Sequence, residues 1–293
     1  MTWSFEPISL LKQPDYIEKL AQSSQMASDY SFVNLWGWAQ EYGLTWAWQH
    51  DLVWIRQARP QEALWAPVGN WEKADWPAFL AQAGKVSSKF IRVPQKLLEL
   101  WETQLGGTIR ITETRGQWDY LYSRRALAEL KGNRYHKKKN LVNQFKNNNA
   151  YEYLSFGPQM VKQALAMQED WCLWRDCESS ETLAAENKAI VRVLSKWDEL
   201  NCMTGGALRV GDTLVAYTIA EALPDNTLVI HFEKGDPDVK GSYQAINQLF
   251  LENALSHYDT VNREQDLDSE GLRKAKLSYN PIGFVRKYQV DLK

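Results

Sequence analysis

Apolar positions in the first 130 residues follow two periods, one helical and one extended. Between residues 15 and 42 they recur every three or four positions and predict two helices, interrupted near residues 28–31. Further helices are expected over residues 71–83 and 95–105. Alternating or short apolar runs predict strands. These strands cover residues 44–49, 52–57, 63–67, 90–93, 109–113 and 118–122.

The pattern of residues 131–293 repeats the same order of elements. Gly211-Asp212 lies between two apolar runs and is the strongest turn signal in the chain, which predicts a hairpin. Predicted strands cover residues 151–155, 206–210, 213–222, 227–234, 260–262 and 284–290. Predicted helices cover residues 158–175, 181–200, 242–256 and 272–277.

Two halves with one order of elements indicate an internal duplication. Two helices, an antiparallel meander, a strand-helix crossover and closing strands form the layout of the acyl-CoA N-acyltransferase (GNAT-like) fold. We therefore expect an α/β (α+β) protein with tandem GNAT-like domains, residues 1–130 and 131–293, each a mixed sheet flanked by helices. Eleven of the 14 Trp precede residue 119, whereas the charged motifs follow it. This contrast predicts a degenerate first domain and an active cleft in the second.

Length and composition agree with two globular domains. The chain has 293 residues, of which 44% are hydrophobic and 24% charged, and a net charge of -2. No apolar run approaches the roughly 20 residues needed to cross a bilayer, and the N-terminus lacks a signal-peptide pattern. These features predict a soluble, cytoplasmic protein without a transmembrane segment. The oligomeric state is not indicated.

The cysteine and histidine spacings indicate neither disulfides nor a metal site. Cys172, Cys177 and Cys202 are odd in number and lack CxxC spacing, so we expect three reduced thiols. The four histidines are scattered and do not form an HExxH motif. No metal or redox cofactor is expected.

A strongly basic stretch joins the two halves. Eight Lys or Arg lie between residues 124 and 146, against one acid, Glu129. Aromatic residues among these cations suit a nucleic acid or nucleotide, whereas a solvated helix face explains the charges equally well. The candidate phosphate- or tRNA-binding residues are Arg134, Lys137, Lys138 and Lys139.

A second charged segment follows the strand predicted at residues 260–262. Ligands are commonly held at such strand ends in α/β sheets. The opposed charges would either neutralise each other in a structural network or hold a zwitterionic substrate. The segment contains Asn262, Glu264, Asp266, Arg273, Lys274 and Lys276.

The strand at residues 227–234 ends in His231-Phe232-Glu233-Lys234. Alternation places His231 and Glu233 on one face, where either would act as a general base. A hydrogen-bonded core histidine is the simpler interpretation of His231. The loop that follows, residues 238–245, offers a single glycine, Gly241, and this is a weak match to the glycine-rich grip on the pyrophosphate of CoA. Tyr243 in this loop is a candidate substrate-binding residue.

Three separated motifs together resemble the family of the phosphatidylglycerol lysyltransferase C-terminal domain. They are Asp119-Tyr120-Leu121-Tyr122, the basic residues 132–145, and residues 262–267 leading to 271–281. The resemblance implies a tandem of acyltransferase-like domains, similar to the Fem-type transferases. Its membrane-bound members acylate a lipid hydroxyl from aminoacyl-tRNA in a cleft of the C-terminal domain. Asp268 departs from the pattern, which has Gly after Asp-Leu.

The resemblance also implies roles for individual residues. A carboxylate of Glu264 or Asp266, with Asn262 and Lys274 nearby, would anchor the aminoacyl ammonium group. Arg273 or Lys276 would stabilise the developing oxyanion, and Glu233 or His231 would take the proton of the acceptor. The basic stretch would contact tRNA phosphate or a lipid headgroup.

Three functions remain open from the sequence. The first is an aminoacyl-tRNA-dependent transferase with a soluble acceptor or with peripheral docking on a membrane lipid headgroup. The second is an acyl-CoA-dependent N-acyltransferase acting on a small soluble acceptor. The third is a non-catalytic module that binds a ligand, RNA or a lipid headgroup.

Overall fold

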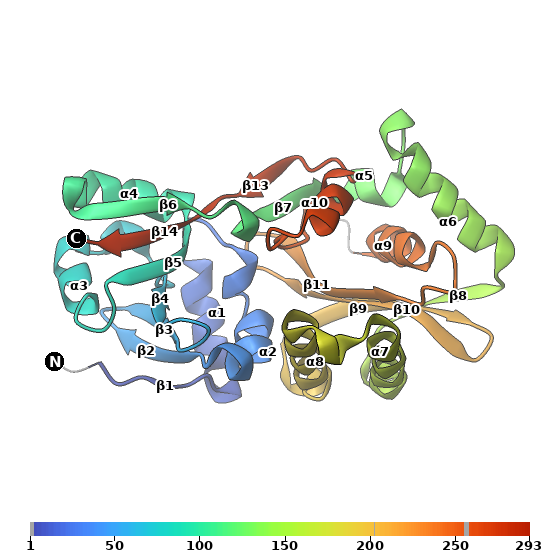
Figure 1. The fold of residues 1–293 in the computed structure, drawn as a ribbon, viewed down its shortest axis with the longest axis horizontal. Helices are drawn as coiled ribbons and strands as arrows, with labels where there is room; N and C mark the ends of the chain where they lie inside the picture. Colours follow the sequence, from blue (N-terminus) through green and yellow to red (C-terminus); the bar gives the residue numbers. More distant parts are fainter. Residues whose placement is uncertain (1–2, 202, 255–257) are drawn as a thin grey trace. The chain divides into compact units, whose positions relative to one another are not determined.

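The computed structural model describes residues 3–201, 203–254 and 258–293 (Figure 1). Cys202, His257 and the end of the helix expected over residues 242–256 lie outside these ranges. The chain divides into two compact units, each described by itself below. The first comprises Met1–Tyr120, Gln265–Arg273 and Phe284–Lys293, and the second Leu121–Glu264 and Lys274–Gly283.

The first unit contains a seven-stranded mixed sheet. In spatial order its strands are β1 (Glu6–Pro7), β2 (Thr45–Gln49), β3 (Leu52–Gln57), β4 (Ala63–Trp65), β5 (Lys89–Pro94), β14 (Lys287–Leu292) and β6 (Ile109–Glu113). Its α-helices are α1 (Gln13–Ala21), α2 (Phe32–Tyr42), α3 (Trp76–Ala83) and α4 (Gln95–Leu105). Only β4 and β5 are parallel, with Trp65 opposite Ile91 at the end of the ladder. The core of this unit is rich in tryptophan, and Trp46, Trp54 and Trp101 are fully buried.

The second unit is built on a sheet of the same type. Its spatial order is β13 (Gly283–Val285), β7 (Asp119–Ser123), β12 (Thr260–Asn262), β11 (Thr227–Gly235), β10 (Thr213–Ala222), β9 (Met203–Val210) and β8 (Tyr151–Ser155). The helices are α5 (Arg124–Glu129), α6 (His136–Asn148), α7 (Val161–Arg175), α8 (Glu181–Leu194) and α9 (Ser242–Asn253). Helix α10 (Glu270–Leu277) is divided between the units, with residues 270–273 in the first and 274–277 in the second. Helices α7 and α8 cover one face of the sheet and α9 the other (Figure 1).

Single turns of 3-10 helix occur in both halves. They are η1 (Leu10–Lys12), η2 (Ser28–Tyr30), η3 (Trp71–Lys73), η4 (Gly106–Thr108), η5 (Arg115–Gln117), η6 (Asn133–Tyr135), η7 (Pro158–Met160), η8 (Cys177–Ser179) and η9 (Trp197–Glu199).

Both sheets follow one strand pattern, which confirms the expected α/β fold with a tandem duplication. In each sheet five strands come in sequence, and a strand from elsewhere in the chain is inserted before the sixth. Strand β14 lies between β5 and β6, and β7 lies between β12 and β13. The strand expected to close the first half therefore completes the second sheet, and the C-terminal strand completes the first.

This exchange moves the division of the chain away from residue 130. Residues 121–130 belong to the second unit, and two C-terminal segments belong to the first. The pattern of apolar positions predicts where a strand lies and which face is buried, but it does not identify the strand's partner.

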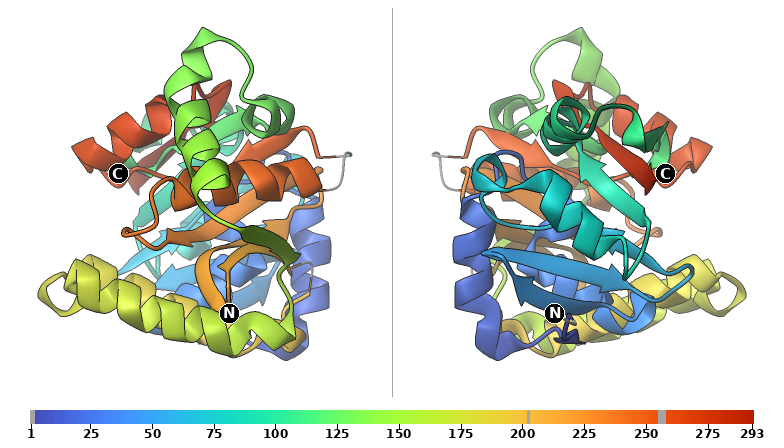
Figure 2. Two further views of the ribbon diagram at one scale, coloured as in Figure 1. Left: turned by 90° about the vertical axis from the view of Figure 1, so that its right-hand side faces the viewer. Right: turned by 90° about the vertical axis from the view of Figure 1, so that its left-hand side faces the viewer.

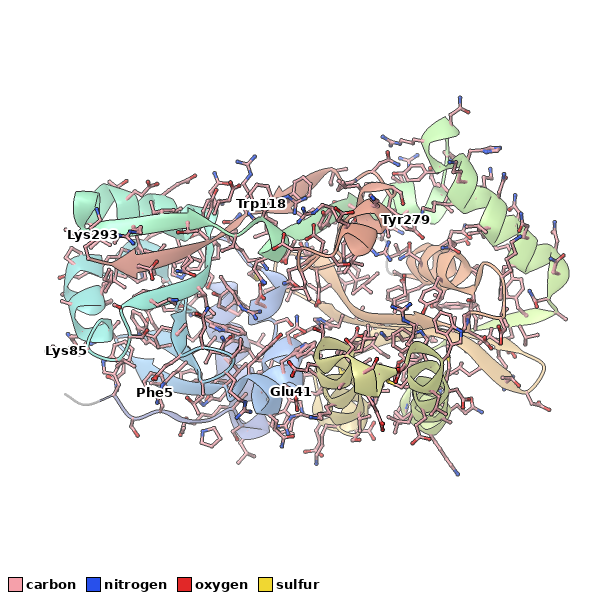
Figure 3. The ribbon with its side chains drawn as sticks, in the orientation of Figure 1. Phe5, Glu41, Lys85, Trp118, Tyr279 and Lys293 are labelled. Carbon is pink, nitrogen blue, oxygen red and sulfur yellow. A yellow bond between two sulfur atoms is a disulfide. The ribbon has the colours of Figure 1, made fainter. Side chains whose placement is uncertain are left out.

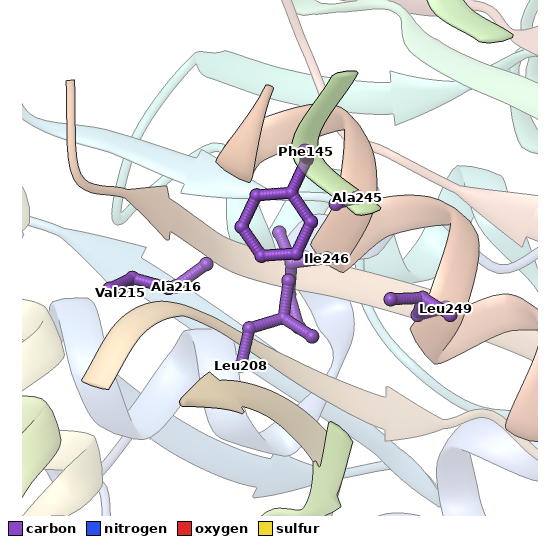
Figure 4. Close-up of a cluster of buried hydrophobic side chains, with 7 residues drawn as sticks. All are labelled: Phe145, Leu208, Val215, Ala216, Ala245, Ile246 and Leu249. Carbon is purple, nitrogen blue, oxygen red and sulfur yellow. The ribbon is translucent and has the colours of Figure 1, made fainter. Parts of the chain in front are cut away.

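A core cluster in the second unit joins helices α6 and α9 to the sheet (Figure 4). It consists of Phe145, Leu208, Val215, Ala216, Ala245, Ile246 and Leu249. Helix α6 lies against α9 (Figure 2). Gly241 precedes α9 at φ +87°, and a Cβ there would lie 2.3 Å from the carbonyl oxygen of Leu141. Glycine is therefore required at this close approach.

The prediction that Cys172 and Cys177 are reduced thiols is wrong, because a disulfide joins them. Helix α7 ends at Arg175, and Asp176 adopts a left-handed conformation that turns the chain back. The two Cα atoms consequently lie 5.0 Å apart, within the range that a disulfide spans. A five-residue separation without CxxC spacing gave no sign of this turn.

None of the helices in the described part of the chain is both long and apolar enough to span a membrane. Within the same residues, no group of three or more His, Cys, Asp or Glu side chains is arranged to hold a metal ion.

Candidate functional site

Strands β11 and β12 diverge at their carboxyl ends and open the second sheet. Their parallel ladder ends with Val229 opposite Asn262, whereas β11 continues to Gly235 beside β10. The Asn262 side chain accepts a hydrogen bond from the Glu264 amide at 2.8 Å, and Glu264 has φ +56°. This turn bends the chain out of β12. Carboxyl ends of strands are where α/β sheets commonly bind ligands.

Glu233 and Arg263 bridge this opening. Arg263 Nη2 donates to Oε1 of Glu233 at 2.7 Å, and Asn247 Nδ2 on α9 donates to Oε2 at 2.9 Å. The side chains of Glu233 and Arg263 are 10% and 15% exposed. Both carboxylate oxygens are thus held in place at the point where the strands separate.

The Arg263 guanidinium lies among aromatic rings. Its Cζ is 4.7 Å from the ring centroid of Tyr279 and 5.9 Å from that of Tyr122. Burial alone would lower the pKa of Arg263, but the interactions with Glu233, followed by Tyr279 and Tyr122, together outweigh burial and raise the pKa. Nη1 is buried and has no hydrogen-bond partner among the described residues. Arg263 therefore holds Glu233 through Nη2.

Lys138 contributes a second cation to the same aromatic ring. Its Nζ lies 4.1 Å from the ring centroid of Tyr279, the residue labelled beside α10 in Figure 3. Burial, followed by the nearby charge of Arg263, lowers the pKa of Lys138. No carboxylate in the described ranges pairs with it. The cluster of Lys138, Glu233, Asn247, Arg263 and Tyr279, here called the Arg263 cluster, has two cations and one anion.

His231 lies two residues before Glu233 on β11 but has a different environment. Its side chain is fully buried between two carboxylates, with Nε2 3.2 Å from Glu221 and Nδ1 2.8 Å from Glu264. Burial alone would lower the pKa of His231, but the hydrogen bonds to both carboxylates raise it to about 9. The ring is consequently a cation at neutral pH, and a protonated imidazole does not accept a proton.

Lys276 supports the backbone of the site. Its Nζ donates to the carbonyl oxygen of Arg263. Together with the Asn262 turn and the His231–Glu264 contact, this bond holds both sides of Arg263. Lys274, on the same helix, is exposed.

Asp266 and Arg273 belong to the first unit and bind each other. The Asp266 side chain is fully buried and accepts two hydrogen bonds from Arg273, at 2.8 and 2.9 Å, and one from Tyr120 at 2.6 Å. Burial alone would raise the pKa of Asp266, but these donors lower it to about 2. Arg273 also binds Asp268 at 2.7 Å. This arrangement corresponds to the structural ion-pair network that the sequence left open.

Tyr243 at the start of α9 belongs to a cluster beside α7. Trp171 Nε1 donates to the Tyr243 hydroxyl at 2.5 Å, and Lys234 Nζ lies 3.8 Å from the Trp171 ring centroid. Lys234 also pairs with Glu186 at 2.8 Å. Burial raises the pKa of Tyr243, so its phenol stays protonated at neutral pH.

The remaining basic candidates lie on the surface of α6 and η6. Arg134, Lys137 and Lys139 are exposed, whereas Lys138 is half-buried. Helical spacing turns Lys138 toward Tyr279 and its neighbours toward solvent. The four residues form one basic run in the sequence, but in the structure Lys138 is half-buried and the other three are exposed.

The loop before α9 uses its amides internally. The amides of Asp238, Val239 and Ser242 donate to the side chain of Asp236, to its carbonyl and to the carbonyl of Val239, at 2.9, 3.2 and 3.1 Å. The Ala245 amide donates to Gly241. These four amides therefore have acceptors within the same turn.

A pocket of about 330 Å³ lies elsewhere in the second unit. Its lining residues are Arg124, Arg125, Ala128, Glu129, Lys131, Gln248 and Glu252. Arg124 donates to the carbonyls of Tyr258 and Leu251, and Glu129 pairs with Arg125 and Lys131. These cations are already satisfied.

The first unit has a counterpart of Arg263. Arg92 follows Ile91, the last residue in the parallel ladder of β4 and β5, and its Cζ lies 4.2 Å from the Trp65 ring centroid. Arg92 and Lys287 both bind Asp29, and Lys287 also binds Asp119. Two cations here face two carboxylates. In the second unit, by contrast, the two cations of the Arg263 cluster, Lys138 and Arg263, share one carboxylate, Glu233.

Of the thirteen candidate residues, the structure brings a few together in the second unit. Glu233 and Lys138 belong to the Arg263 cluster itself, and Asn262, Glu264, His231 and Lys276 brace it. Sequence reasoning missed Arg263, Asn247 and Tyr279 as site residues. Asn247 was detectable as a polar residue on the buried face of an amphipathic helix.

Comparison with known proteins confirms the resemblance seen in the three motifs. The sequence profile of the family "Phosphatidylglycerol lysyltransferase, C-terminal" matches residues 20–290. An uncharacterized protein of Mycoplasmoides gallisepticum is 24% identical over 178 residues, which cover 59% of this chain. The match spans 56% of that relative, little more than half of its length.

Solved structures show the same fold. A conserved protein of unknown function from Bacteroides thetaiotaomicron is 32% identical with a TM-score of 0.93, covering 100% of both chains. L-PGS from Bacillus licheniformis is 12% identical with a TM-score of 0.63, covering 98% of this chain and 93% of its own. FemX is 7% identical with a TM-score of 0.63, covering 98% and 96%. The last two support the fold alone.

Proposed function

Because this chain belongs to the family of the phosphatidylglycerol lysyltransferase C-terminal domain, we propose that it transfers an aminoacyl group from an aminoacyl-tRNA ester to an acceptor. The reaction takes place at the Arg263 cluster. The observation that carries the proposal is the Glu233–Arg263 pair at the divergence of β11 and β12. It places a carboxylate and the positive charge of a guanidinium at the usual ligand position of the fold.

The pair supplies the two groups that acyl transfer needs. A hydroxyl or amine of the acceptor attacks the ester carbonyl carbon, and Glu233 takes the proton that the nucleophile loses. The oxyanion that develops is stabilised by Arg263. The bond to the ribose oxygen then breaks, and this oxygen receives the proton from Glu233. No proton is gained or lost overall.

Neighbouring candidates act through position. His231 holds Glu264, Asn262 shapes the turn, and Lys276 binds the Arg263 carbonyl. These contacts keep the guanidinium aligned. Alignment matters because a small misplacement of a catalytic group lowers the rate of transfer. Of the two proposed bases, Glu233 is favoured because His231 is already protonated.

The aminoacyl-tRNA donor is favoured over acyl-CoA because the exposed Arg134, Lys137 and Lys139 suit contacts with tRNA phosphates, whereas the loop before α9 has a single glycine, Gly241, in place of a glycine-rich phosphate grip. The acceptor is left open between a soluble molecule and a lipid headgroup.

The test is transfer of a radiolabelled amino acid from bulk aminoacyl-tRNA to phosphatidylglycerol vesicles or to a panel of soluble amines and alcohols. Glu233→Gln should lower the rate by about 100-fold or more, as expected for loss of a general base. The matched control is Glu152→Gln, which breaks an exposed Glu–Arg pair with Arg209 and should leave the rate unchanged.

Equal rates for wild type and Glu233→Gln would overturn the catalytic role. Use of acetyl-CoA in place of aminoacyl-tRNA would support the acyl-CoA reaction instead. Binding of tRNA that falls steeply with salt, without any transfer, would identify a binding module.

A further inference from the structure

The Arg263 cluster carries an excess of positive charge directed at one aromatic ring. Lys138 Nζ and Arg263 Cζ lie 4.1 and 4.7 Å from the ring centroid of Tyr279. The one carboxylate of the cluster, Glu233, is held by Arg263 and Asn247. Lys138 pairs with none of the described carboxylates, and Arg263 Nη1 is buried without an acceptor.

Such an arrangement costs free energy unless an anion completes it. Buried donors are nearly always satisfied, by protein, water or ligand. Two like charges beside one ring also repel each other in a partly desolvated site. The counterpart around Arg92 lacks this excess, because Asp29 and Asp119 offset Arg92 and Lys287. The imbalance is therefore specific to the second unit.

We propose that Lys138 and Arg263 Nη1 form a subsite for a phosphate group of the substrate, with the Tyr279 ring as its floor. Phosphate suits this pair because it accepts a directed bond from a guanidinium and the point charge of an ammonium together. The inference deepens the proposed function and rests on it for the identity of the site. The phosphate belongs either to the terminal nucleotide of the donor or to a glycerophosphate acceptor.

Binding measurements test the subsite without requiring turnover. Three probes are titrated into the full chain by calorimetry or NMR: inorganic phosphate, adenosine 5′-monophosphate and sn-glycerol 3-phosphate. Lys138→Gln should weaken the probe that binds wild type by about tenfold, the loss expected for one charge-assisted contact. Lys139→Gln removes an exposed neighbour on the same helix and should change binding by less than about twofold.

Two further variants separate charge from folding. Lys138→Arg keeps a cation against Tyr279 and should restore most of the affinity. Arg263→Lys keeps a partner for Glu233 but removes the free second donor, so it should weaken binding while the urea midpoint stays near that of wild type. If the urea midpoint of Arg263→Lys differs from that of wild type, the binding measured with Lys138→Gln decides the test.

Each outcome decides the proposal. Preferential binding of adenosine monophosphate assigns the subsite to the donor, and preferential binding of glycerol phosphate assigns it to the acceptor. Absence of binding by all three probes, or equal losses for Lys138→Gln and Lys139→Gln, overturns the subsite. Transfer activity with an unchanged KM in Lys138→Gln would overturn it while leaving the proposed function intact. Binding that depends on Lys138 without any transfer would support the subsite and overturn the proposed function.

Discussion

Lys287 donates a hydrogen bond of 2.7 Å to Asp119, and both side chains are completely buried. Lys287 begins β14 and Asp119 begins β7, the two strands that the sheets exchange. Ser28 also donates to Asp119, from its amide at 2.7 Å and its hydroxyl at 3.0 Å. The pair therefore ties together the starts of both exchanged strands.

Removing one partner of this pair should strongly destabilise the protein. Lys287→Met leaves the carboxylates of Asp29 and Asp119 buried with one cation fewer, which costs about 3–5 kcal/mol. Urea unfolding followed by tryptophan fluorescence measures the loss. Glu62→Gln breaks the exposed Arg56–Glu62 pair and should cost less than about 1 kcal/mol. Similar losses for both variants would contradict a special role for Lys287.

Protonation of His231 should make stability depend on alkaline pH. Its folded-state pKa of about 9 lies above the ordinary histidine value of 6.5, which applies to the unfolded chain. The stabilisation is complete below pH 6.5 and is lost as pH rises through about 9. Its full size is on the order of 3 kcal/mol. Unfolding free energies between pH 6 and 10 should show this decline, and His231→Gln should remove it. A wild-type curve that is flat over this window would show that the ring is neutral.

Substitution of Gly241 should be far more costly than substitution of another left-handed glycine. Gly241→Ala places a Cβ 2.3 Å from the Leu141 carbonyl, whereas Gly211→Ala, at φ +59°, meets no atom within 4 Å. Gly211→Ala should cost about 1–2 kcal/mol from backbone strain alone. Gly241→Ala adds the displacement of α6, so its thermal midpoint should fall well below that of Gly211→Ala. Equal thermal midpoints for the two variants would mean that α6 can move away from the new Cβ without a loss of stability.

The Cys172–Cys177 disulfide should contribute modestly to stability. It closes a short loop at the end of α7, and chain entropy predicts about 2 kcal/mol for such a loop. The double variant Cys172→Ser/Cys177→Ser should therefore lose this amount in urea. Dithiothreitol should destabilise wild type to the same extent and leave the double variant unaffected. A double variant as sensitive to dithiothreitol as wild type would place the effect elsewhere.

Lys276 tests whether positioning, rather than direct chemistry, governs the site. Lys276→Met removes the ammonium that binds the Arg263 carbonyl. We expect kcat to fall by about tenfold to 100-fold because the guanidinium loses alignment, with the pH dependence of transfer unchanged. A shifted pH profile would instead indicate that Lys276 itself exchanges a proton.

The sequence by itself determined the order of elements, the duplication and the family. Apolar periodicity is a local property, so the hairpin at Gly211-Asp212 and the amphipathic helix that became α9 were predictable from their own residues. Glu233 was recognised as a candidate because it ends a strand, and Lys138 because it lies in a basic run. These inferences needed only neighbours along the chain.

Tertiary structure decided everything that depends on distant neighbours. The exchange of strands β7 and β14 depends on pairing across more than a hundred residues, which a local apolar pattern does not specify. The opposite charges of Arg273 and Asp266 are evident in the sequence, but only the fold pairs the two residues with each other. Lys138 differs from Lys137 and Lys139 because burial beside Tyr279 and Arg263 sets its surroundings. The charge of each side chain follows from its residue type, whereas its compensation by a partner depends on three-dimensional packing.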